Sequence, residues 1–470
     1  MIGFLKRCFL SYLRFFARGA LAKHKPTIIG IAGSVGKSST AHALFSVLKQ
    51  YGNTKLVGNS ETGIPLGILG LAPSTYSLVD WLKMFLAAPS GIDHLKGTKY
   101  LIAEMGIDDP YPPKNMEYLL TILKPDIAIV LNESATHSMQ FEKLLARNPL
   151  LSGEGAAERS EAGVRYEEER LKLVTQKIAE EDSKIITKSG CKIGIYNADD
   201  ENINAAIKQS KAKTTLYPFG KENTNAVSYK TYDVTTSGSS FSFSSTMQQS
   251  NNVTISLNLP GLLLPREYEQ TFAAIIAAAA SLGVPKETII KGLQSFSLPS
   301  GRSTLLTGIN NSKIIDSSYN ASKAAVFAFL ELVERLKKQT KRPVVFLFGD
   351  MRELGDTAKI EHEEVAKKLT GIVDYLYLVG PLTQKFVLPS YPLAPSTYSL
   401  KEIRWFANAR FAGEYLKDHI PQNALVLVKG SQNTIFLEEA IKYILANKED
   451  TKKLCRQSAF WKDVKKRQGL

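Results

Sequence analysis

The sequence is poor in cysteine: Cys8, Cys191 and Cys455 are the only three in 470 residues, and they lie far apart. They form no Cys-x-x-Cys pair and no other metal-ligand spacing, which excludes a disulfide framework and suits a reducing cytoplasm. Acidic residues are also scarce relative to basic ones, 45 against 59, so the formal net charge is +14. This charge favours acidic ligands or surfaces, but it does not choose among nucleotides, sugar nucleotides, nucleic acid and anionic lipid.

The sequence has no hydrophobic run long enough to span a membrane. Its most apolar N-terminal piece, residues 1–22, is interrupted by four basic residues and has no small-residue cleavage site of the signal-peptide kind. The pattern predicts an amphipathic helix. The apolar side of this helix would carry Phe4, Leu5, Phe9, Leu13 and Phe16. Two interpretations stay open, a helix docked on the protein's own core and a peripheral contact with a membrane surface.

The stretch from Thr27 to Gln50 predicts a buried strand, a glycine-bounded loop and a helix. The loop runs Gly33-Ser34-Val35-Gly36-Lys37-Ser38-Ser39. Backbone N–H groups beside the two glycines can close on phosphate oxygens, and the helix N-terminus adds further donors. We therefore predict a nucleoside triphosphate site, in which Lys37 contacts the β- and γ-phosphates and the Ser38 hydroxyl binds Mg²⁺. The spacing departs from G-x-x-x-x-G-K-[ST], because Ile31 stands five positions before Gly36.

Two more chemistry-capable side chains follow apolar runs that predict buried strands. Glu104 ends the run 99–104, and His137 lies in the loop after the run 127–131. In a parallel sheet these strand ends and the phosphate loop would share one edge, where Glu104 could hold Mg²⁺ and His137 a second metal ion. Taken alone, Glu104 could be a solvated strand end, and His137 is better explained as an ordinary loop histidine. The neighbouring phosphate loop favours function.

The pattern of apolar, polar and turn-forming residues predicts the structure of other segments in the first half of the chain. Residues 58–65 predict a turn-rich loop that contains Asn59 and Thr62 as candidate substrate contacts. The charge-dense stretch of about 147–169 predicts an exposed insertion. The alternating residues 214–259 predict a small antiparallel subdomain built of hairpins. Helices are expected at 37–51, 76–88, 171–186, 268–282 and 285–296, and further strands at 55–57 and 192–196.

A second α/β domain is expected after the segment Leu298-Pro299-Ser300-Gly301-Arg302, whose proline and glycine favour a turn. Strands are predicted at 314–316, 344–348, 376–379 and 425–428, alternating with helices. Polar candidates follow these strands, namely Asp316, Ser317, Asn320, Asp350, Glu353, Lys429 and Ser431. From residue 448 the chain is basic, and a solvated surface helix is favoured over a nucleic-acid arm.

The motifs occur in one order along residues 26–446. They are GSVGKSS at Gly33, N-x-x-x-G-I-P at Asn59, AEMG at Ala103, NADD at Asn197, SGR at Ser300, DSSYNAS at Asp316, GDMRELG at Gly349 and VKGSQ at Val428. Each motif alone is moderate evidence, but eight in register resemble the Mur ligase family. The resemblance implies a P-loop central ATPase domain with a parallel sheet over residues 26–299 and a Rossmann-like C-terminal ligase domain over residues 300–447. They are flanked by a basic amphipathic helix at 1–25 and a basic tail at 448–470.

The resemblance also implies an ATP-dependent amide ligase that acts through an acyl phosphate. It makes Lys37, Glu104 and His137 catalytic, together with Arg302, an arginine that in the family meets nucleotide phosphate when the C-terminal domain closes. GDMRELG with SYNA indicates D-alanyl-D-alanine as the amine and an acidic muramoyl peptide as the carboxylate substrate. We expect a cytoplasmic monomer that uses ATP and Mg²⁺ and binds no nucleic acid. A non-catalytic Mur-like binding protein, a ligase for another peptide-like or lipid-linked carboxylate, and a P-loop kinase or GTPase remain as alternatives.

The sequence departs from the family pattern at four places. Only about 25 residues precede the phosphate loop, so we expect no counterpart of the family's N-terminal UDP-binding domain. Asp182 aligns with a lysine that many members carbamylate, although Lys177 or Lys184 could be the true counterpart. Gln270 ends a segment that replaces the adenine-binding H-N-x-x-N. Ser317 aligns with the ribose-binding aspartate, leaving Asp316 one position earlier.

Overall fold

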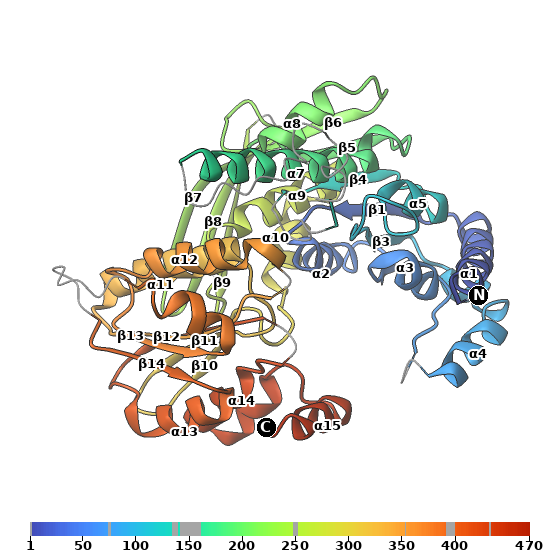
Figure 1. Cartoon of the computed structure of the whole chain (residues 1–470). Helices are drawn as coiled ribbons and strands as arrows, with labels where there is room; N and C mark the ends of the chain where they lie inside the picture. Colours follow the sequence, from blue (N-terminus) through green and yellow to red (C-terminus); the bar gives the residue numbers. More distant parts are fainter. Residues whose placement is uncertain are drawn as a thin grey trace. The chain divides into compact units, whose positions relative to one another are not determined.

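The computed structural model describes residues 2–73, 77–133, 140–141, 161–247, 252–352, 354–391, 400–431 and 434–470. The chain folds as two compact units (Figure 1). Unit 1 comprises residues 1–231, 242–257 and 269–297, and unit 2 comprises residues 232–241, 258–268 and 298–470. None of the described helices is long and apolar enough to cross a membrane.

A nine-stranded sheet in the order β2-β3-β1-β4-β5-β6-β7-β8-β9 organises the first half of the chain. Its strands are β1 Thr27–Ala32, β2 Thr54–Val57, β3 Tyr100–Glu104, β4 Ile127–Val130, β5 Ile193–Asn197, β6 Thr215–Gly220, β7 Val227–Thr235, β8 Gly238–Ser245 and β9 Val253–Pro260. From β2 through β7 in this order, each strand is parallel to its neighbours. Because β1 is buried at five of its six positions, it reads as a nearly continuous apolar run, as expected for a central parallel strand.

Helices cover both faces of this sheet. They are α1 Ile2–His24, α2 Lys37–Leu48, α3 Ser60–Ile68, α4 Leu78–Ala87, the 3₁₀ turn η1 Ser90–Leu95, α5 Met116–Ile122, α7 Glu161–Thr187, α8 Glu201–Lys208, α9 Tyr268–Ser281 and α10 Lys286–Gln294. Helices α1, α3, α5, α7 and α8 contribute to one apolar core with alternate residues of β1 and β3. Helix α2 packs against α10, where Gly292 lets the backbone approach Val47. The sheet is therefore enclosed, as parallel sheets require.

Helix α1 is docked on this core. Leu13, Ala17 and Ala20 are fully buried, and α1 packs beside α3 and η1 (Figure 1). Among the residues predicted for the apolar side of this helix, Leu13 is buried in the core. Phe9 and Phe16 are partly buried against the same core. The predicted apolar side of α1 is therefore docked on the protein's own core.

Unit 2 is built on a six-stranded sheet in the order β10-β11-β15-β12-β13-β14, in which only β10 is antiparallel to its neighbour. Its strands are β10 Thr304–Thr307, β11 Lys313–Ser317, β12 Val344–Gly349, β13 Tyr375–Val379, β14 Glu402–Phe406 and β15 Leu425–Lys429. Its helices are α11 Lys323–Thr340, η2 Gly355–Thr357, α12 Ala358–Lys368, the π turn η3 Thr383–Val387, α13 Ala409–His419, α14 Glu438–Ile444, η4 Lys448–Lys453 and α15 Ala459–Arg467. Helices α13 and α14 cover one face, and α11 packs against β15 and α12.

Most predicted elements are confirmed, and so is the α/β fold of both halves. Strands β10 and β14 were not predicted. Both are edge strands, and β14 carries Glu402 and Arg404, so neither gives the unbroken apolar run of a central strand. The predicted hairpin strands are present, and they continue the main sheet beyond β6.

One loop prediction is wrong, and the end of the predicted insertion is helical. The segment predicted as a turn-rich loop forms α3, because Ile64 and Ile68 are fully buried and their burial outweighs the helix-breaking tendency of Gly63 and Pro65. The end of the predicted insertion, residues 161–169, forms the first turns of α7, in a stretch rich in helix-favouring Glu and Arg. The rest of that insertion lies outside the described residues.

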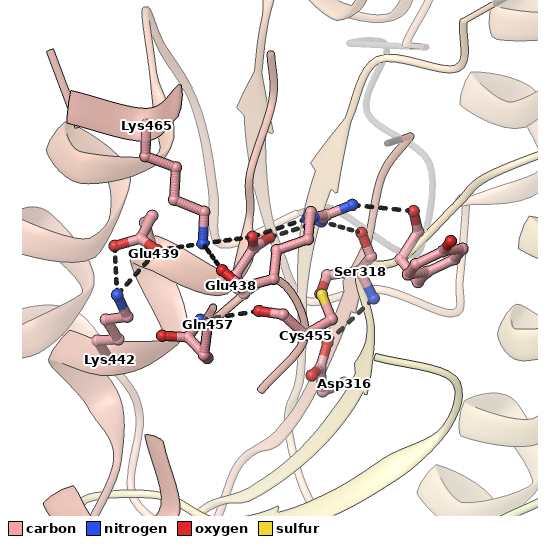
Figure 2. Close-up of polar contacts among 10 residues, drawn as sticks. Asp316, Ser318, Glu438, Glu439, Lys442, Cys455, Gln457 and Lys465 are labelled. Carbon is pink, nitrogen blue, oxygen red and sulfur yellow. Dashed lines mark hydrogen bonds and ion pairs between the residues drawn. The ribbon is translucent and has the colours of Figure 1, made fainter. Parts of the chain in front are cut away.

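The basic tail is not simply solvated, because it is fixed to unit 2 by buried charges. Arg456 donates to both carboxylate oxygens of Glu438, at 2.8 and 2.6 Å, and the Lys465 ammonium lies 2.8 Å from the same carboxylate. Lys465 also contacts Glu439, as Figure 2 shows. The Glu438 side chain is completely buried. Burial alone would raise its pKa, but the two cations outweigh burial, so the pKa of Glu438 lies below its usual value.

We predict that Glu438→Gln destabilises unit 2 by about 3 kcal/mol near neutral pH, because it leaves two buried cations without their shared anion. A carboxylate whose pKa is lowered by folding stabilises the protein above its unfolded-state pKa, and this contribution is lost as the pH falls through the lower folded value. The gap in melting temperature between wild type and variant should therefore narrow between about pH 5 and pH 3.

The matched control is Glu449→Gln, which removes an exposed ion pair with Lys452. It should change stability by less than about 0.5 kcal/mol. Equal melting temperatures for the two variants would contradict a stabilising role for the buried cluster.

Candidate active site

The carboxyl ends of β1, β3 and β4 meet at one edge of the nine-stranded sheet. Strand β1 lies between the other two, with Ile31 opposite Glu104 on β3 and Ala32 opposite Val130 on β4. Because all three strands run in the same direction, the segments that follow them lie side by side. This edge therefore brings together the loop at Gly33, the carboxylate of Glu104 and the residues after β4.

The phosphate loop is held open by glycine conformations and by Asn132. Gly33 and Gly36 have positive φ values of 127° and 91°, which favour glycine, and a Cβ atom at Gly33 would lie 3.2 Å from the Asn132 backbone. Ser34 N–H donates to the Asn132 carbonyl at 2.8 Å, and Val35 N–H donates to Asn132 Oδ1 at 3.2 Å. No side chain caps α2 at its N-terminus, so its first N–H groups face the loop as donors for an anion.

Lys37 and Ser38 open α2 and face the strand edge. The Lys37 ammonium donates to the carbonyls of Gly33 and Ser34. The Ser38 hydroxyl donates to Glu104 Oε2 at 2.8 Å, and Glu104 is buried at the end of β3. Two residues that are 66 positions apart and were both predicted as metal ligands thus lie in direct contact. Ser39, the next residue of α2, is buried.

A second carboxyl, not selected from the sequence, lies beside the loop. Glu133 Oε2 accepts a hydrogen bond from the Ser34 hydroxyl at 2.8 Å, and Glu133 interacts directly with Asp182 on α7. Asp182 is only 1% exposed. Oε1 of Glu133 and Oδ1 of Asp182 are shielded from water and have no hydrogen-bond partner among the described residues. The position of Glu133 directly after a buried strand was the signal that could have identified it.

Burial sets the protonation of this carboxyl pair. Burial raises the pKa of Glu133 well above its usual value, and the negative charge of Asp182 raises it further. Burial also raises the pKa of Asp182, while the positive charge of Lys37 acts in the opposite direction. Two buried carboxyls that repel each other favour a shared proton or a bound cation.

The alternative counterparts of Asp182 lie elsewhere on the surface of α7. Lys177 pairs with Glu180 at 2.6 Å, and about two-fifths of each side chain is exposed. Lys184 pairs with Glu181 and Glu117, at 2.6 and 3.1 Å. Asp182, in contrast, is not an exposed helix residue, because it is buried and interacts with Lys37.

The remaining candidates of unit 1 border the same edge. Gln270, predicted to contact adenine, accepts a hydrogen bond from Asn132 Nδ2 at 2.8 Å and so supports the residue that holds the phosphate loop. Asn59 Oδ1 accepts from the Gly106 N–H at 3.0 Å, which joins the start of α3 to the segment after β3. Thr62 lies half-buried in the first turn of α3. His137 lies outside the described residues.

The candidates of unit 2 gather at the carboxyl ends of β11, β15 and β12. The Lys429 ammonium donates to the Ser317 hydroxyl at 3.3 Å and to the Asn320 carbonyl at 2.6 Å. Lys429 is 2% exposed, and burial, together with the charge of Arg302, lowers its pKa to about 7. Arg302 lies over the Tyr319 ring, 4.7 Å from its centroid. A lysine with a pKa of about 7 exists in large part as the uncharged amine at physiological pH.

Asp316, Asp350 and Ser431 complete this second cluster. Asp316 is fully buried, its Oδ2 has no partner among the described residues, and burial raises its pKa to about 6. The Asp350 carboxylate accepts from Thr383 N–H at 2.8 Å. Ser431 N–H donates to the Asp350 carbonyl at 3.0 Å, which links the ends of β12 and β15. Glu353 lies outside the described residues.

These oxygen atoms suit a hard divalent cation. In the part of the chain that the structure describes, no three His, Cys, Asp or Glu side chains converge as a preformed metal site. Mg²⁺ does not require one, because it is usually held by one or two carboxylates together with phosphates and water. Ser38 with Glu104 supplies one such donor set. The unpartnered oxygens of Glu133 and Asp182 supply another.

Two segments of the chain match known protein domains, which define the class of protein. The Mur ligase middle domain matches residues 174–277, and the Mur ligase glutamate ligase domain matches residues 301–432. Together the two matched segments make up half of the chain. The chain belongs to the Mur ligase family of ATP-dependent amide ligases.

Named relatives match most of the chain. It is 26% identical to UDP-N-acetylmuramoyl-tripeptide--D-alanyl-D-alanine ligase of Rickettsia prowazekii, over 89% of this chain and 78% of that protein. It is 24% identical to the Bacillus subtilis ligase of the same name, over 93% of this chain and 79% of that protein. The MurF ligase of Thermotoga maritima, solved with ADP, superposes with a TM-score of 0.66 at 20% identity, covering 97% of this chain and 84% of that one.

The buried carboxyl pair of Glu133 and Asp182 leads to a prediction about stability. At pH 8 without divalent cations, Asp182→Asn should raise the melting temperature by several degrees, because it removes a buried charge that costs on the order of 2 kcal/mol. An acid whose pKa is raised by folding destabilises the protein as the pH rises through that value, so the difference should shrink at pH 5. Mg²⁺ should then raise the melting temperature of wild type more than that of the variant.

The control for this experiment is Glu180→Gln, on the same helix but partly exposed. Its melting temperature and its response to Mg²⁺ should match those of wild type. An identical Mg²⁺ response in Asp182→Asn would contradict cation binding by the pair.

Proposed function

We propose that this protein is the ligase that joins D-alanyl-D-alanine to a muramoyl-peptide precursor of peptidoglycan. The observation that carries the proposal is the contact of Ser38 with Glu104 beside the Lys37 loop, in a chain whose relatives of that name match about nine-tenths of its length. The contact supports phosphoryl transfer from ATP, and the relatives support these two substrates. We place the reaction in the cytoplasm and expect a monomer that binds no nucleic acid.

The proposed reaction has two steps. The substrate carboxylate attacks the γ-phosphorus of ATP, which gives an acyl phosphate and ADP. The amine of D-alanyl-D-alanine then adds to the acyl carbon, and the tetrahedral intermediate collapses to the amide with loss of phosphate and of the amine proton. Two anions must meet in the first step, so positive charge and a fixed geometry lower its barrier.

Residues of unit 1 would meet the demands of the first step. Lys37 would exchange its loop carbonyls for phosphate oxygens, while the N–H groups at the start of α2 hold the phosphate chain. Mg²⁺, when bound, supplies further charge neutralisation and orients the phosphates. Ser38 and Glu104 would hold one ion, and Glu133 with Asp182 a second. Because this set contains its own carboxylates, we expect no carbamylated lysine and no dependence of turnover on bicarbonate.

Further residues would position the two substrates. Asn59 and Thr62 lie where α3 begins beside the end of β3, and we assign them to the carboxylate substrate. Asn320, Asp350, Lys429 and Ser431 form the unit 2 cluster, and we assign them to the amine substrate. Lys429, whose pKa of about 7 lets it exist as a free amine, is suited to accept the proton released in the second step.

We predict that purified protein with ATP, Mg²⁺, UDP-N-acetylmuramoyl tripeptide and D-alanyl-D-alanine yields the pentapeptide mass. Lys37→Ala should lower turnover by at least about a hundredfold, because one fixed cation at the transferred phosphoryl group is lost. The control is Lys49→Ala at the other end of α2, which should keep wild-type turnover. Lys49 is exposed and lies over the Phe45 ring.

The outcomes separate the phosphate site from the substrate assignment. Amide formation that persists in Lys37→Ala would refute the assigned phosphate loop. ATP turnover that needs a different carboxylate or amine would leave the loop in place and refute the proposed substrates. Loss of activity on stripping CO₂ from the buffer would contradict a site built only from carboxylates.

A further inference from the structure

Exposed apolar side chains gather on one side of unit 1. Among the described residues, six large apolar side chains are more than half exposed, and four of them lie on α1 and α4: Phe15, Val79, Leu82 and Leu86, at 72, 60, 60 and 69%. The other two, Phe411 and Phe460, lie singly on helices of unit 2. Single exposed apolar residues are ordinary, whereas a cluster marks an interaction surface.

Helix α4 presents this cluster from a fixed position. Its inner side packs on α1: the Phe9 and Trp81 rings are 5.2 Å apart, the Tyr12 and Phe85 rings stack at 4.0 Å, and the Tyr12 hydroxyl donates to the Phe85 carbonyl. Its outer side carries Val79, Leu82 and Leu86 at helical spacing, which places them in one stripe. Helix α4 is thus apolar on the side that docks and also on the side that faces solvent.

The outer strip of α1 joins this stripe and adds positive charge. Arg14 fixes the opposite flank of α1, because it donates to Thr121 on α5. Between that flank and α4 lie the exposed Phe15 and Arg18, with Arg7 farther along the helix. Residues 2–25 contain six Lys or Arg and no Asp or Glu. Within the described part of the chain, neither Arg7 nor Arg18 makes an ion pair.

A cavity beside α1 has the same combination of charge and apolar surface. It has a volume of about 730 Å³ and lies between α1 and α5, with Leu21, Ile28 and Leu123 among its apolar walls. Three cations line it: Arg18, Lys124 and Lys188. The one acid that lines it, Glu117, is already paired with Lys184 at 3.1 Å. An apolar wall beside several cations suits an acyl chain that carries a phosphate.

We propose that the outer face of α1 and α4 docks unit 1 on a bilayer that contains anionic phospholipid. The stripe of α4 and Phe15 would enter the interface between headgroups and acyl chains, and Arg7, Arg18 and the cavity cations would contact lipid phosphates. A second copy of this chain fits less well, because two faces of the same positive charge would repel each other. The apolar side of α1 itself is used by the core, so α4 is the inserting element.

The test measures sedimentation of the full chain with vesicles of phosphatidylcholine alone and of phosphatidylcholine mixed with phosphatidylglycerol. Wild type should bind the mixed vesicles and leave pure phosphatidylcholine mostly unbound. Leu82→Glu with Leu86→Glu should lower the partition coefficient on mixed vesicles by at least about tenfold, because two inserting side chains become anions. Arg7→Glu with Arg18→Glu should lower it similarly, and added salt should weaken wild-type binding.

Matched controls come from unit 2. Phe411→Glu replaces an apolar residue that is half exposed on α13, and Lys417→Glu reverses an exposed charge on the same helix. Neither should change vesicle binding by more than about twofold if the contact is confined to α1 and α4. Melting curves check that each variant folds, and the milder pair Leu82→Ser with Leu86→Ser repeats the test if the glutamates unfold α4.

Three results would overturn the proposal. The first is a wild-type protein that binds neither kind of vesicle. The second is a Leu82/Leu86 variant that folds and binds as well as wild type. The third is a dimer, seen by light scattering, that the same variant converts to a monomer, since this would assign the face to a second copy.

Discussion

The parallel pairing of β1 between β3 and β4 is the constraint on which the candidate site of unit 1 depends. It places the loop after β1, Glu104 at the end of β3 and Asn132 after β4 at one edge. Asn132 then holds the loop through its carbonyl and its side chain, and Gln270 holds Asn132 in turn. A slip of one residue between these strands would turn Glu104 to the other face of the sheet and separate it from Ser38.

Buried carboxylates serve two purposes in this molecule, and their partners distinguish them. Glu438 is surrounded by Arg456 and Lys465 and has a lowered pKa, so its charge is satisfied within the protein and it fixes the tail. Asp182 and Asp316 each keep an oxygen without a partner among the described residues, and burial raises the pKa of both. Such groups weaken the folded state by themselves and gain from a cation or a donor that arrives with a ligand.

The two buried clusters of unit 2 are connected through the chain after β11. Arg456 donates to the Ser318 and Tyr319 carbonyls as well as to Glu438. Asn320, the next residue, accepts from Lys429. The segment that holds the candidate substrate residues is thus fixed on one side by the tail and on the other by the end of β15. A tail that looks like a solvated basic helix in the sequence therefore supports the candidate site.

The sequence by itself determined the strands with unbroken apolar runs, the glycine-bounded loop after β1 and the family, because local patterns define each of them. Gly33 and Gly36 set the loop, and Lys37 and Ser38 follow it directly. It also located Glu104, since a carboxylate after a buried strand stands out locally. The edge strands β10 and β14, the helix α3 across Pro65 and the burial of Lys465 depend on what each segment packs against, and only the tertiary structure decided them. The same holds for Glu133 and Asp182. Their pairing is a property of two segments about fifty residues apart that only the folded chain brings together.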